Sequence, residues 1–263
     1  MDGRTAPLRL LKEYRKLALV KYRSRKRKMV LEGTLLLREA LLAGIELESL
    51  IYTPEFAAKP EAARILSGAN CRDKIFRVNS TTFSAIAQTD TPQGVAAIAL
   101  IPDNRDIFKF NKNFYLVLDR IQDPGNLGTI IRTAAAAGVD GVILLQGTAN
   151  PYSHKALRSS MGGVFYIPIF FEADQPDWYA LMKKKEMHLI AAHPQGELPY
   201  YHVNFRRPCT VIIGNESQGV ANMLLEKVDT RAFIPLGRKF NTLNAAVAAA
   251  AFILEHQRQN SFH

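Results

Sequence analysis

The chain has 263 residues, of which 48% are hydrophobic and 22% charged, and its formal net charge is +10. This length is enough for one large or two modest domains with real cores. The apolar stretches are too short to span a membrane. With only Cys71 and Cys209 present, neither a disulfide framework nor a cysteine zinc site is expected, and the cytoplasm is the simplest location.

The positive charge is concentrated in the first 28 residues, which we call the basic arm. It holds eleven Lys and Arg against two acidic residues, a balance of 11 − 2 = +9, so the rest of the chain carries 10 − 9 = +1. Such a segment favours binding to a polyanion, most often nucleic acid. The alternatives are a solvated or disordered tail and a mitochondrial presequence. Apolar residues at roughly helical spacing over 8–22 predict a basic amphipathic helix.

Residues 29–101 alternate between helical and extended patterns, which predicts a small α/β domain. Helices are expected at 32–44, where Gly44 ends the first one, at 58–67 and from Ser80, and strands at 50–53, 75–78 and 95–101. The polar stretch 88–94 is either an exposed recognition loop or an ordinary turn. Residues 102–113 lack a clear period and are predicted to be a linker.

From residue 114 to 263 the pattern predicts a second, parallel α/β domain. A strand at 114–118, a helix at 126–137 and a strand at 142–145 form a βαβ unit, whose strands must be parallel. Further strands are expected at 165–171, 188–192, 211–213 and 232–236, with helices at 178–186 and 243–257. Asn241 or Thr242 is expected to cap the last helix. No dinucleotide or P-loop glycine pattern occurs.

Three motifs in this domain occur in a characteristic order. The first is Asp123-Pro-Gly-Asn-Leu-Gly-Thr-Ile-Ile-Arg132, the second Gly214-Asn-Glu-Ser-Gln-Gly219, and the third combines Ile234-Pro-Leu-Gly with Thr-Leu-Asn244. Together they resemble the motifs of the SpoU family, RNA ribose 2′-O-methyltransferases of the SPOUT superfamily. Any one motif alone is a weak signal, but three in order are specific.

The resemblance implies a trefoil-knotted parallel-sheet domain that transfers a methyl group from S-adenosylmethionine to a ribose 2′-hydroxyl of RNA, without a metal. It also implies a homodimer and an N-terminal RNA substrate-binding domain similar to ribosomal proteins. Ribosomal RNA is favoured over transfer RNA as the substrate. The alternatives are a transfer RNA methyltransferase, a resistance-type ribosomal RNA methylase, and a non-catalytic RNA-binding or ribosome-assembly protein on the same fold.

The same resemblance assigns the site residues. The catalytic residues it implies are Arg132, Asn126, Glu216 and Asn244, and the residues that hold the methyl donor are Gly214, Gly219, Ile234, Leu236 and Leu243. Ser160 matches a weaker family element. We expect Arg132 to clamp a phosphate of the target and stabilise the developing alkoxide, because a guanidinium rarely loses its proton.

Each of these residues also has an ordinary structural interpretation. Arg132 is compatible with a solvated surface position, Asn126 with a helix cap, and Ile234 and Leu243 with plain core packing. The third motif departs from the family pattern at Ala246, where a serine is common, so one hydroxyl is missing from the predicted site.

Overall fold

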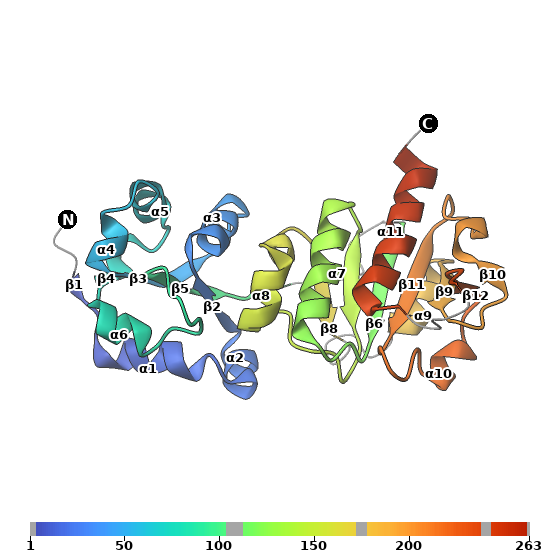
Figure 1. Cartoon of the computed structure of the whole chain (residues 1–263), viewed down its shortest axis with the longest axis horizontal. Coiled ribbons are helices and arrows are strands. Elements are labelled where there is room, and N and C mark those ends of the chain that lie inside the picture. Colours follow the sequence, from blue (N-terminus) through green and yellow to red (C-terminus); the bar gives the residue numbers. More distant parts are fainter. Residues whose placement is uncertain (1–3, 104–112, 172–177, 238–242, 262–263) are drawn as a thin grey trace. The chain divides into compact units, whose positions relative to one another are not determined.

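The computed structural model describes residues 4–103, 113–171, 178–237 and 243–261 (Figure 1). Residues 104–112 of the predicted linker lie outside the described residues. The chain forms two compact units. The first comprises the chain up to Asp103 together with Tyr152–Phe165, and the second contains the remaining residues.

The first unit is built on a mixed sheet of strand order β1-β4-β3-β5-β2, in which β1, β4 and β3 are parallel and β5 is antiparallel to both β3 and β2. Its strands are β1 (Arg4–Thr5), β2 (Lys28–Glu32), β3 (Leu47–Tyr52), β4 (Ile75–Arg77) and β5 (Val95–Leu100). Its helices are α1 (Leu8–Lys16), α2 (Val20–Lys26), α3 (Thr34–Leu42), α4 (Pro54–Ala57), α5 (Ala62–Gly68), α6 (Ser80–Ser84) and α8 (His154–Ser160).

The described part of the basic arm is folded into this unit. Strand β1 pairs with β4, and Tyr14 of helix α1 and Leu17 just after it, each 1% exposed, are buried in the core of the unit. The Tyr14 hydroxyl donates to the carbonyl of Ala96 at 3.2 Å, and burial raises the pKa of this phenol. A disordered tail is therefore wrong for residues 4–28, and the predicted helix is two helices with a turn at 17–19.

The polar stretch 88–94 is attached to the start of α3. The backbone N–H of Gln88 donates to Glu32 Oε2 at 2.7 Å, and Gln93 Oε1 accepts from the backbone N–H of Thr34 at 2.8 Å. Glu32 is 7% exposed, so its carboxylate anchors the loop from inside the unit.

The second unit contains a sheet of seven parallel strands among the residues described, in the order β10-β12-β9-β11-β6-β7-β8. This confirms the predicted parallel α/β class. The strands are β6 (Phe114–Asp119), β7 (Gly141–Leu144), β8 (Ile169–Phe171), β9 (His188–Ala192), β10 (Leu198–Pro199), β11 (Cys209–Gly214) and β12 (Thr230–Phe233). The helices are α7 (Pro124–Ala136), α9 (Trp178–Lys184), α10 (Asn222–Leu225) and α11 (Ala245–Ser261).

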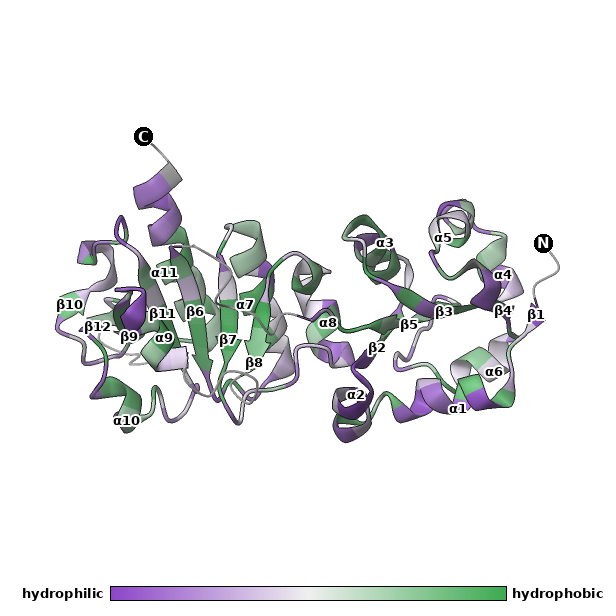
Figure 2. Ribbon diagram, turned by 180° about the vertical axis from the view of Figure 1, so that it is seen from behind, coloured by the Kyte–Doolittle hydropathy of each residue, from purple (hydrophilic) through white to green (hydrophobic). Residues whose placement is uncertain are grey.

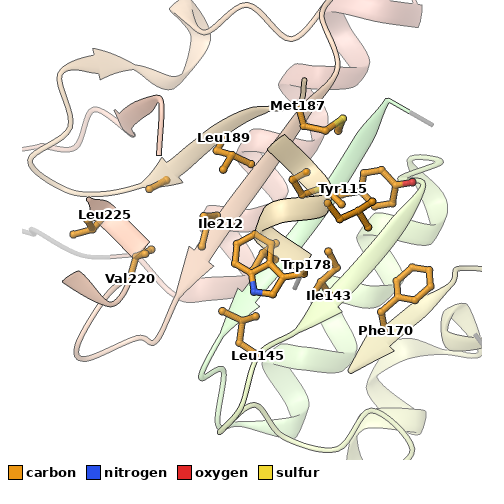
Figure 3. Close-up of a cluster of buried hydrophobic side chains, with 14 residues drawn as sticks. Tyr115, Ile143, Leu145, Phe170, Trp178, Met187, Leu189, Ile212, Val220 and Leu225 are labelled. Atoms are coloured by element: carbon orange, nitrogen blue, oxygen red, sulfur yellow. The ribbon is translucent and has the colours of Figure 1, made fainter. Parts of the chain in front are cut away.

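Side chains alternate between the two faces of this sheet, and each face has its own core. On one face Tyr115 and Val117 pack with Ile143 against Trp178 and Met182 of α9, as Figure 3 shows for the labelled residues of this cluster. Figure 2 shows the corresponding hydrophobic colour along the central strands. Both faces are covered, as expected for strands that are apolar throughout.

Helices α7 and α11 pack against each other and belong to the opposite face. There the ring of Phe114 in β6 stacks on His256 of α11 with ring centroids 3.9 Å apart, and Phe205 meets Phe114 edge-on at 6.3 Å. The C-terminal helix is therefore held against the first strand of the unit. The trefoil knot that the resemblance implies stays a prediction.

Some elements differ from the predictions. Strand β2 and helix α8 were not predicted, strand β8 begins at Ile169 rather than 165, and β12 lies two to three residues before the predicted strand. No helix among the described residues combines the length and hydrophobicity needed to cross a membrane.

Candidate active site

A cavity of about 730 Å³ opens at the carboxyl ends of strands β9, β11 and β12 and at the start of α11. Open parallel sheets commonly bind ligands at this edge, because several loops leave the strands side by side there. The volume lies within the range of small-molecule sites.

All five residues predicted to hold the methyl donor line this cavity: Gly214, Gly219, Ile234, Leu236 and Leu243. They come from three nearby segments of the sequence: the end of β11 with its turn, the stretch after β12 and the residues just before α11. Ile213 and Phe252 add apolar wall, and Glu216 lies at the polar side. Ile234 and Leu243 are only half-buried, and both border the cavity.

The second motif forms a tight turn against the end of β11. Asn215 Oδ1 accepts from the backbone N–H groups of Ser217 at 2.9 Å and Gln218 at 3.0 Å, and the backbone N–H of Gly219 donates to the Asn215 carbonyl at 2.8 Å. A Cβ on Gly214 would lie 2.2 Å from the backbone of Gly219 and Val220. Glycine is therefore required at 214 for the close approach of two backbones.

Asp119 and Arg120, which follow β6, brace this turn. Arg120 Nε donates to Asp119 Oδ1 at 2.8 Å, its Nη2 donates to the Gly219 carbonyl at 3.2 Å, and Asn215 Nδ2 donates to the Arg120 carbonyl at 3.0 Å. Asp119 Oδ2 accepts from the backbone N–H of Ala221 at 2.8 Å. The hydrogen bonds to Asp119 raise the pKa of Arg120. Sequence reasoning missed this pair; its one signal was two adjacent opposite charges at a strand end.

Three of the four predicted catalytic residues form one polar chain. Asn126 Nδ2 donates to Glu216 Oε1 at 2.6 Å, and Asn244 Nδ2 donates to Asn126 Oδ1 at 3.0 Å. This row of hydrogen bonds joins the first, second and third motifs, and Glu216 connects the row to the cavity. Asn126 is thereby oriented by an acceptor on one side and a donor on the other.

Asn126 does not cap α7. The cap is Asp123, whose Oδ1 accepts from the backbone N–H of Asn126 at 2.9 Å. This leaves the Asn126 side chain free to reach Glu216, because a neighbouring carboxylate already satisfies the start of the helix.

Asn244 is oriented by hydrogen bonds from the backbone at the start of α11. Its Oδ1 accepts from the backbone N–H groups of Ala246 at 2.9 Å and Val247 at 3.4 Å, which is the geometry of a helix N-cap. The predicted caps, Asn241 and Thr242, lie outside the described residues. The Asn244 amide is held in place by its own helix while its Nδ2 points to Asn126.

Arg132 is not part of the hydrogen-bonded row formed by Asn244, Asn126 and Glu216. It is exposed on α7, does not line the cavity, and makes no hydrogen bond or ion pair with any residue that the structure describes. Ser160 belongs to the first unit, where its hydroxyl is buried and donates to the Leu157 carbonyl at 2.9 Å. The roles of both residues stay predictions.

The lining suits a nucleoside-containing donor. The apolar walls from Ile234, Leu236 and Leu243 offer a surface for an adenine ring, and the turns after β11 and β12 present backbone groups to a ribose. In the described part of the chain, His, Cys, Asp and Glu side chains form no group of three that could hold a metal ion.

Comparison with known proteins identifies both units. Residues 113–254 match the model of the SpoU rRNA Methylase family, and residues 9–97 match the MRM3-like substrate binding domain. The chain is 34% identical over 244 residues to the 23S rRNA (guanosine(2553)-2′-O)-methyltransferase RlmP of Bacillus subtilis strain 168, covering 92% of this chain and 94% of that relative.

Solved structures agree over the whole length. The AdoMet-bound rRNA methyltransferase from Sinorhizobium meliloti superposes with a TM-score of 0.83 at 32% identity, covering 97% of each chain. The SpoU methyltransferase AviRb from Streptomyces viridochromogenes, in complex with AdoMet, gives a TM-score of 0.85 at 25% identity, covering 98% of this chain and 100% of that one. The second and third motifs line one cavity, the first is hydrogen-bonded to both through Asn126, and a family model matches more than half of the chain, so the chain belongs to the SpoU rRNA methylase family.

Proposed function

We propose that this protein methylates a ribose 2′-hydroxyl in 23S ribosomal RNA. As a member of its family it is an S-adenosylmethionine-dependent RNA 2′-O-ribose methyltransferase, and its relatives from Bacillus subtilis and Streptomyces viridochromogenes are both named for 23S rRNA. The observation that carries the proposal is the polar chain Asn244–Asn126–Glu216 at the edge of the cavity, because it joins all three motifs.

When bound, S-adenosylmethionine would supply its sulfonium methyl group to the ribose oxygen; the neutral thioether S-adenosylhomocysteine would leave and the 2′-hydroxyl proton would pass to solvent. Gly214, Gly219, Ile234, Leu236 and Leu243 would hold this donor, since all line the cavity. Asn126, Glu216 and Asn244 would orient the ribose through a fixed row of hydrogen-bonding groups.

We assign to Arg132 the role of binding a phosphate next to the target ribose and stabilising the alkoxide that develops there. Its guanidinium is exposed and has no partner in the described chain, so its donors remain available to a phosphate. Because Arg132 is not joined to the cavity of its own chain, we propose that a second copy of the chain completes the site.

An apolar face on α11 supports a homodimer. Val247 and Leu254 are 54% and 59% exposed, and their spacing of seven residues places them on the same side of the helix. The adjacent helix α7 carries Arg132. Burying these residues against a second copy would remove apolar surface from water and bring Arg132 to an interface. We further propose a cytoplasmic location, in keeping with a ribosomal RNA substrate and two free cysteines.

The test is transfer of labelled methyl from S-adenosylmethionine to total RNA, followed by separation of the RNA species and nucleoside digestion. We expect the label in a 2′-O-methyl nucleoside of 23S rRNA. Label in transfer RNA would exclude the proposed substrate but keep the chemistry, whereas label on a base would exclude the acceptor atom. Donor binding without label on any RNA would indicate a substrate that exists only during ribosome assembly, whereas absence of donor binding would favour a non-catalytic RNA-binding protein.

A further inference from the structure

A second hollow, of about 430 Å³, lies in the first unit between helices α1 and α2 and the starts of β2 and β3. We call it the α1–α2 groove. Five cations line it: Arg9, Lys12, Lys16, Lys26 and Lys28. Only two carboxylates accompany them, so the lining carries a net charge of three positive.

Both carboxylates are held by one lysine. Lys28 Nζ lies 2.8 Å from Glu13 Oε1 and 2.5 Å from Glu48 Oε2, and its side chain is 16% exposed. Burial lowers the pKa of Lys28, but the hydrogen bonds to Glu13 and Glu48 outweigh it and raise the pKa above its usual value. Lys28, Glu13 and Glu48 therefore form ion pairs with one another.

The other four cations are not satisfied in this way. Arg9, Lys12, Lys16 and Lys26 are exposed and have no carboxylate within ion-pair distance among the residues that the structure describes. Lys16 lies over the ring of Tyr22, with Nζ 5.9 Å from the ring centroid. Figure 2 shows α2 strongly hydrophilic and α1 divided between hydrophilic and hydrophobic sides.

Three of these cations form a row along one face of α1. Arg9, Lys12 and Lys16 are spaced by three and four residues, which places them on adjacent turns over about 10 Å of helix. The opposite face of the helix is fixed, because Tyr14 and Leu17 are buried. The row therefore keeps its direction relative to the rest of the unit.

A buried arginine fixes the second wall. Arg23 is 2% exposed, and its Nη1 donates to the carbonyls of Leu17 at 2.7 Å and Ala18 at 3.3 Å, just past the end of α1. This cation satisfies carbonyls that the helix end leaves open, and it joins α2 to α1. A groove fixed in this way binds with less loss of conformational freedom than a flexible basic tail.

We infer that the α1–α2 groove binds the phosphate backbone of the RNA substrate. Exposed cations in a row recognise a chain of regularly spaced anions, and phosphodiesters are the anions that a ribosomal RNA methyltransferase meets. Contacts of this kind position the RNA without reading its bases. The inference rests on the proposed function and adds to it a contact surface outside the cavity.

The test compares two double variants with equal loss of charge. Lys12→Gln with Lys16→Gln removes two cations of the groove, and Lys21→Gln with Arg25→Gln removes two exposed cations of α2 that do not line it. RNA affinity is measured across salt concentrations, and S-adenosylmethionine affinity is measured by calorimetry. For the groove variant we expect RNA binding to weaken about tenfold near 0.15 M salt and the slope of log affinity against log salt to fall by about 1.4.

The control variant should change both quantities much less. Equal losses in the two variants would mean that overall charge, and not the groove, attracts RNA, and an unchanged slope in the groove variant would also overturn the inference. Failure of the proposed function is a separate result: the wild-type protein would transfer no methyl to 23S rRNA, whatever the difference between the two variants.

Discussion

Arg132 combines an exposed position with a predicted essential role, and its substitution separates catalysis from folding. We expect Arg132→Ala to reduce methyl transfer by at least a hundredfold, since one lost charge-stabilising donor costs about 10²–10³ in turnover. Donor affinity and thermal stability should be nearly unchanged, because the side chain neither lines the cavity nor bonds to described residues. Single-turnover methylation and calorimetry measure the two effects.

Arg132→Lys is the matched control. It keeps the charge but loses the planar pair of donors, so activity between that of Ala and wild type is expected. If Arg132→Ala transferred methyl at the wild-type rate, the assigned role would be wrong.

Asn126 is the central member of the polar chain: its amide nitrogen donates to Glu216, and its amide oxygen accepts from Asn244. Asn126→Ala removes the donor to Glu216 at 2.6 Å and should lower kcat/KM by roughly 10- to 100-fold, as for loss of a hydrogen bond to a charged group. Asn126→Asp should be worse near neutral pH, because it places two carboxylates together.

The pH profile distinguishes these variants. Two adjacent carboxylates raise the pKa of one of them, so the pair shares a proton as pH falls. Activity of Asn126→Asp should therefore recover partly from about pH 8 to about pH 6, whereas Asn126→Ala should show no such recovery. A flat ratio between the two variants would contradict the contact with Glu216.

At the scale of elements, two glycines of one turn are required for different reasons. Gly214→Ala would place a Cβ 2.2 Å from backbone, so we expect a loss of about 3 kcal/mol in the free energy of unfolding and loss of donor binding. Gly219 has a φ of +67°, but a Cβ at this position would have no other atom within 4 Å. Gly219→Ala should therefore lower the free energy of unfolding by only about 1 kcal/mol, the cost of the left-handed backbone. Chemical denaturation and calorimetry on both variants check this order; equal losses would contradict it.

The packing of α11 on β6 predicts an acid-sensitive stability. Burial lowers the pKa of His256 below its usual 6.5, so the unfolded chain binds the proton more readily than the folded one. The contribution of this ring to stability is therefore present above about pH 6.5 and is lost as pH falls through the lowered pKa. His256→Phe keeps the stack on Phe114 and should reduce the drop in Tm from about pH 7.5 to about pH 5.

The exposed ring of His202 provides the control for this measurement. His202→Gln should leave the pH dependence of Tm as in the wild type. An identical pH dependence in His256→Phe would show that the stacked ring is not protonated in this range.

Periodicity predicted most elements of the second unit, because its strands are continuous apolar runs separated by helical patterns. Periodicity did not predict β2, because Lys28 follows a run of basic residues that is typical of a helix. The burial of Met29, Val30 and Leu31 becomes evident only when β5 is seen to pair with β2. Pairing across more than sixty residues leaves no local signal.

The site was predicted through its motifs, and what remained unknown was which atoms meet. Sequence alone left Asn126 open as a helix cap, because nothing local shows that Asp123 takes that role and frees the amide. The brace formed by Asp119 and Arg120 also depends on contacts about a hundred residues apart in sequence. Motif order identified the loops, and the strand order determines their geometry.

At the scale of the whole molecule, the apolar face of α11 predicts the oligomeric state. Leu254→Glu should convert a dimer to a monomer and reduce methyl transfer with it, because a buried carboxylate without a partner opposes association. Leu42→Glu, at an equally exposed leucine of α3, is the control and should leave the mass unchanged. Light scattering after size-exclusion chromatography measures both.

Mixing two inactive variants tests whether Arg132 serves the second copy. Arg132→Ala and Glu216→Ala, exchanged into one dimer, should recover about a quarter of wild-type activity, since half of the dimers are mixed and one of their two sites is complete. Absence of recovery in a verified mixed dimer would place Arg132 with the cavity of its own chain.

Deleting residues 1–28 is not a clean test of RNA binding. The deletion would remove β1 and the buried Tyr14 and Leu17 along with the cations, so a loss of affinity would not distinguish charge from folding. Point substitutions at exposed positions avoid this difficulty.

Helix α8 returns to the first unit from the second half of the sequence, and this affects the order of folding during synthesis. Its neighbours include β2, and Gly162 just beyond it lies close to Glu39. At about 5–20 residues per second, the ribosome needs roughly 3 to 12 s to extend the chain from Asp103 to Phe165. The unit that begins to emerge first therefore completes its packing only after strands of the second unit have also been made.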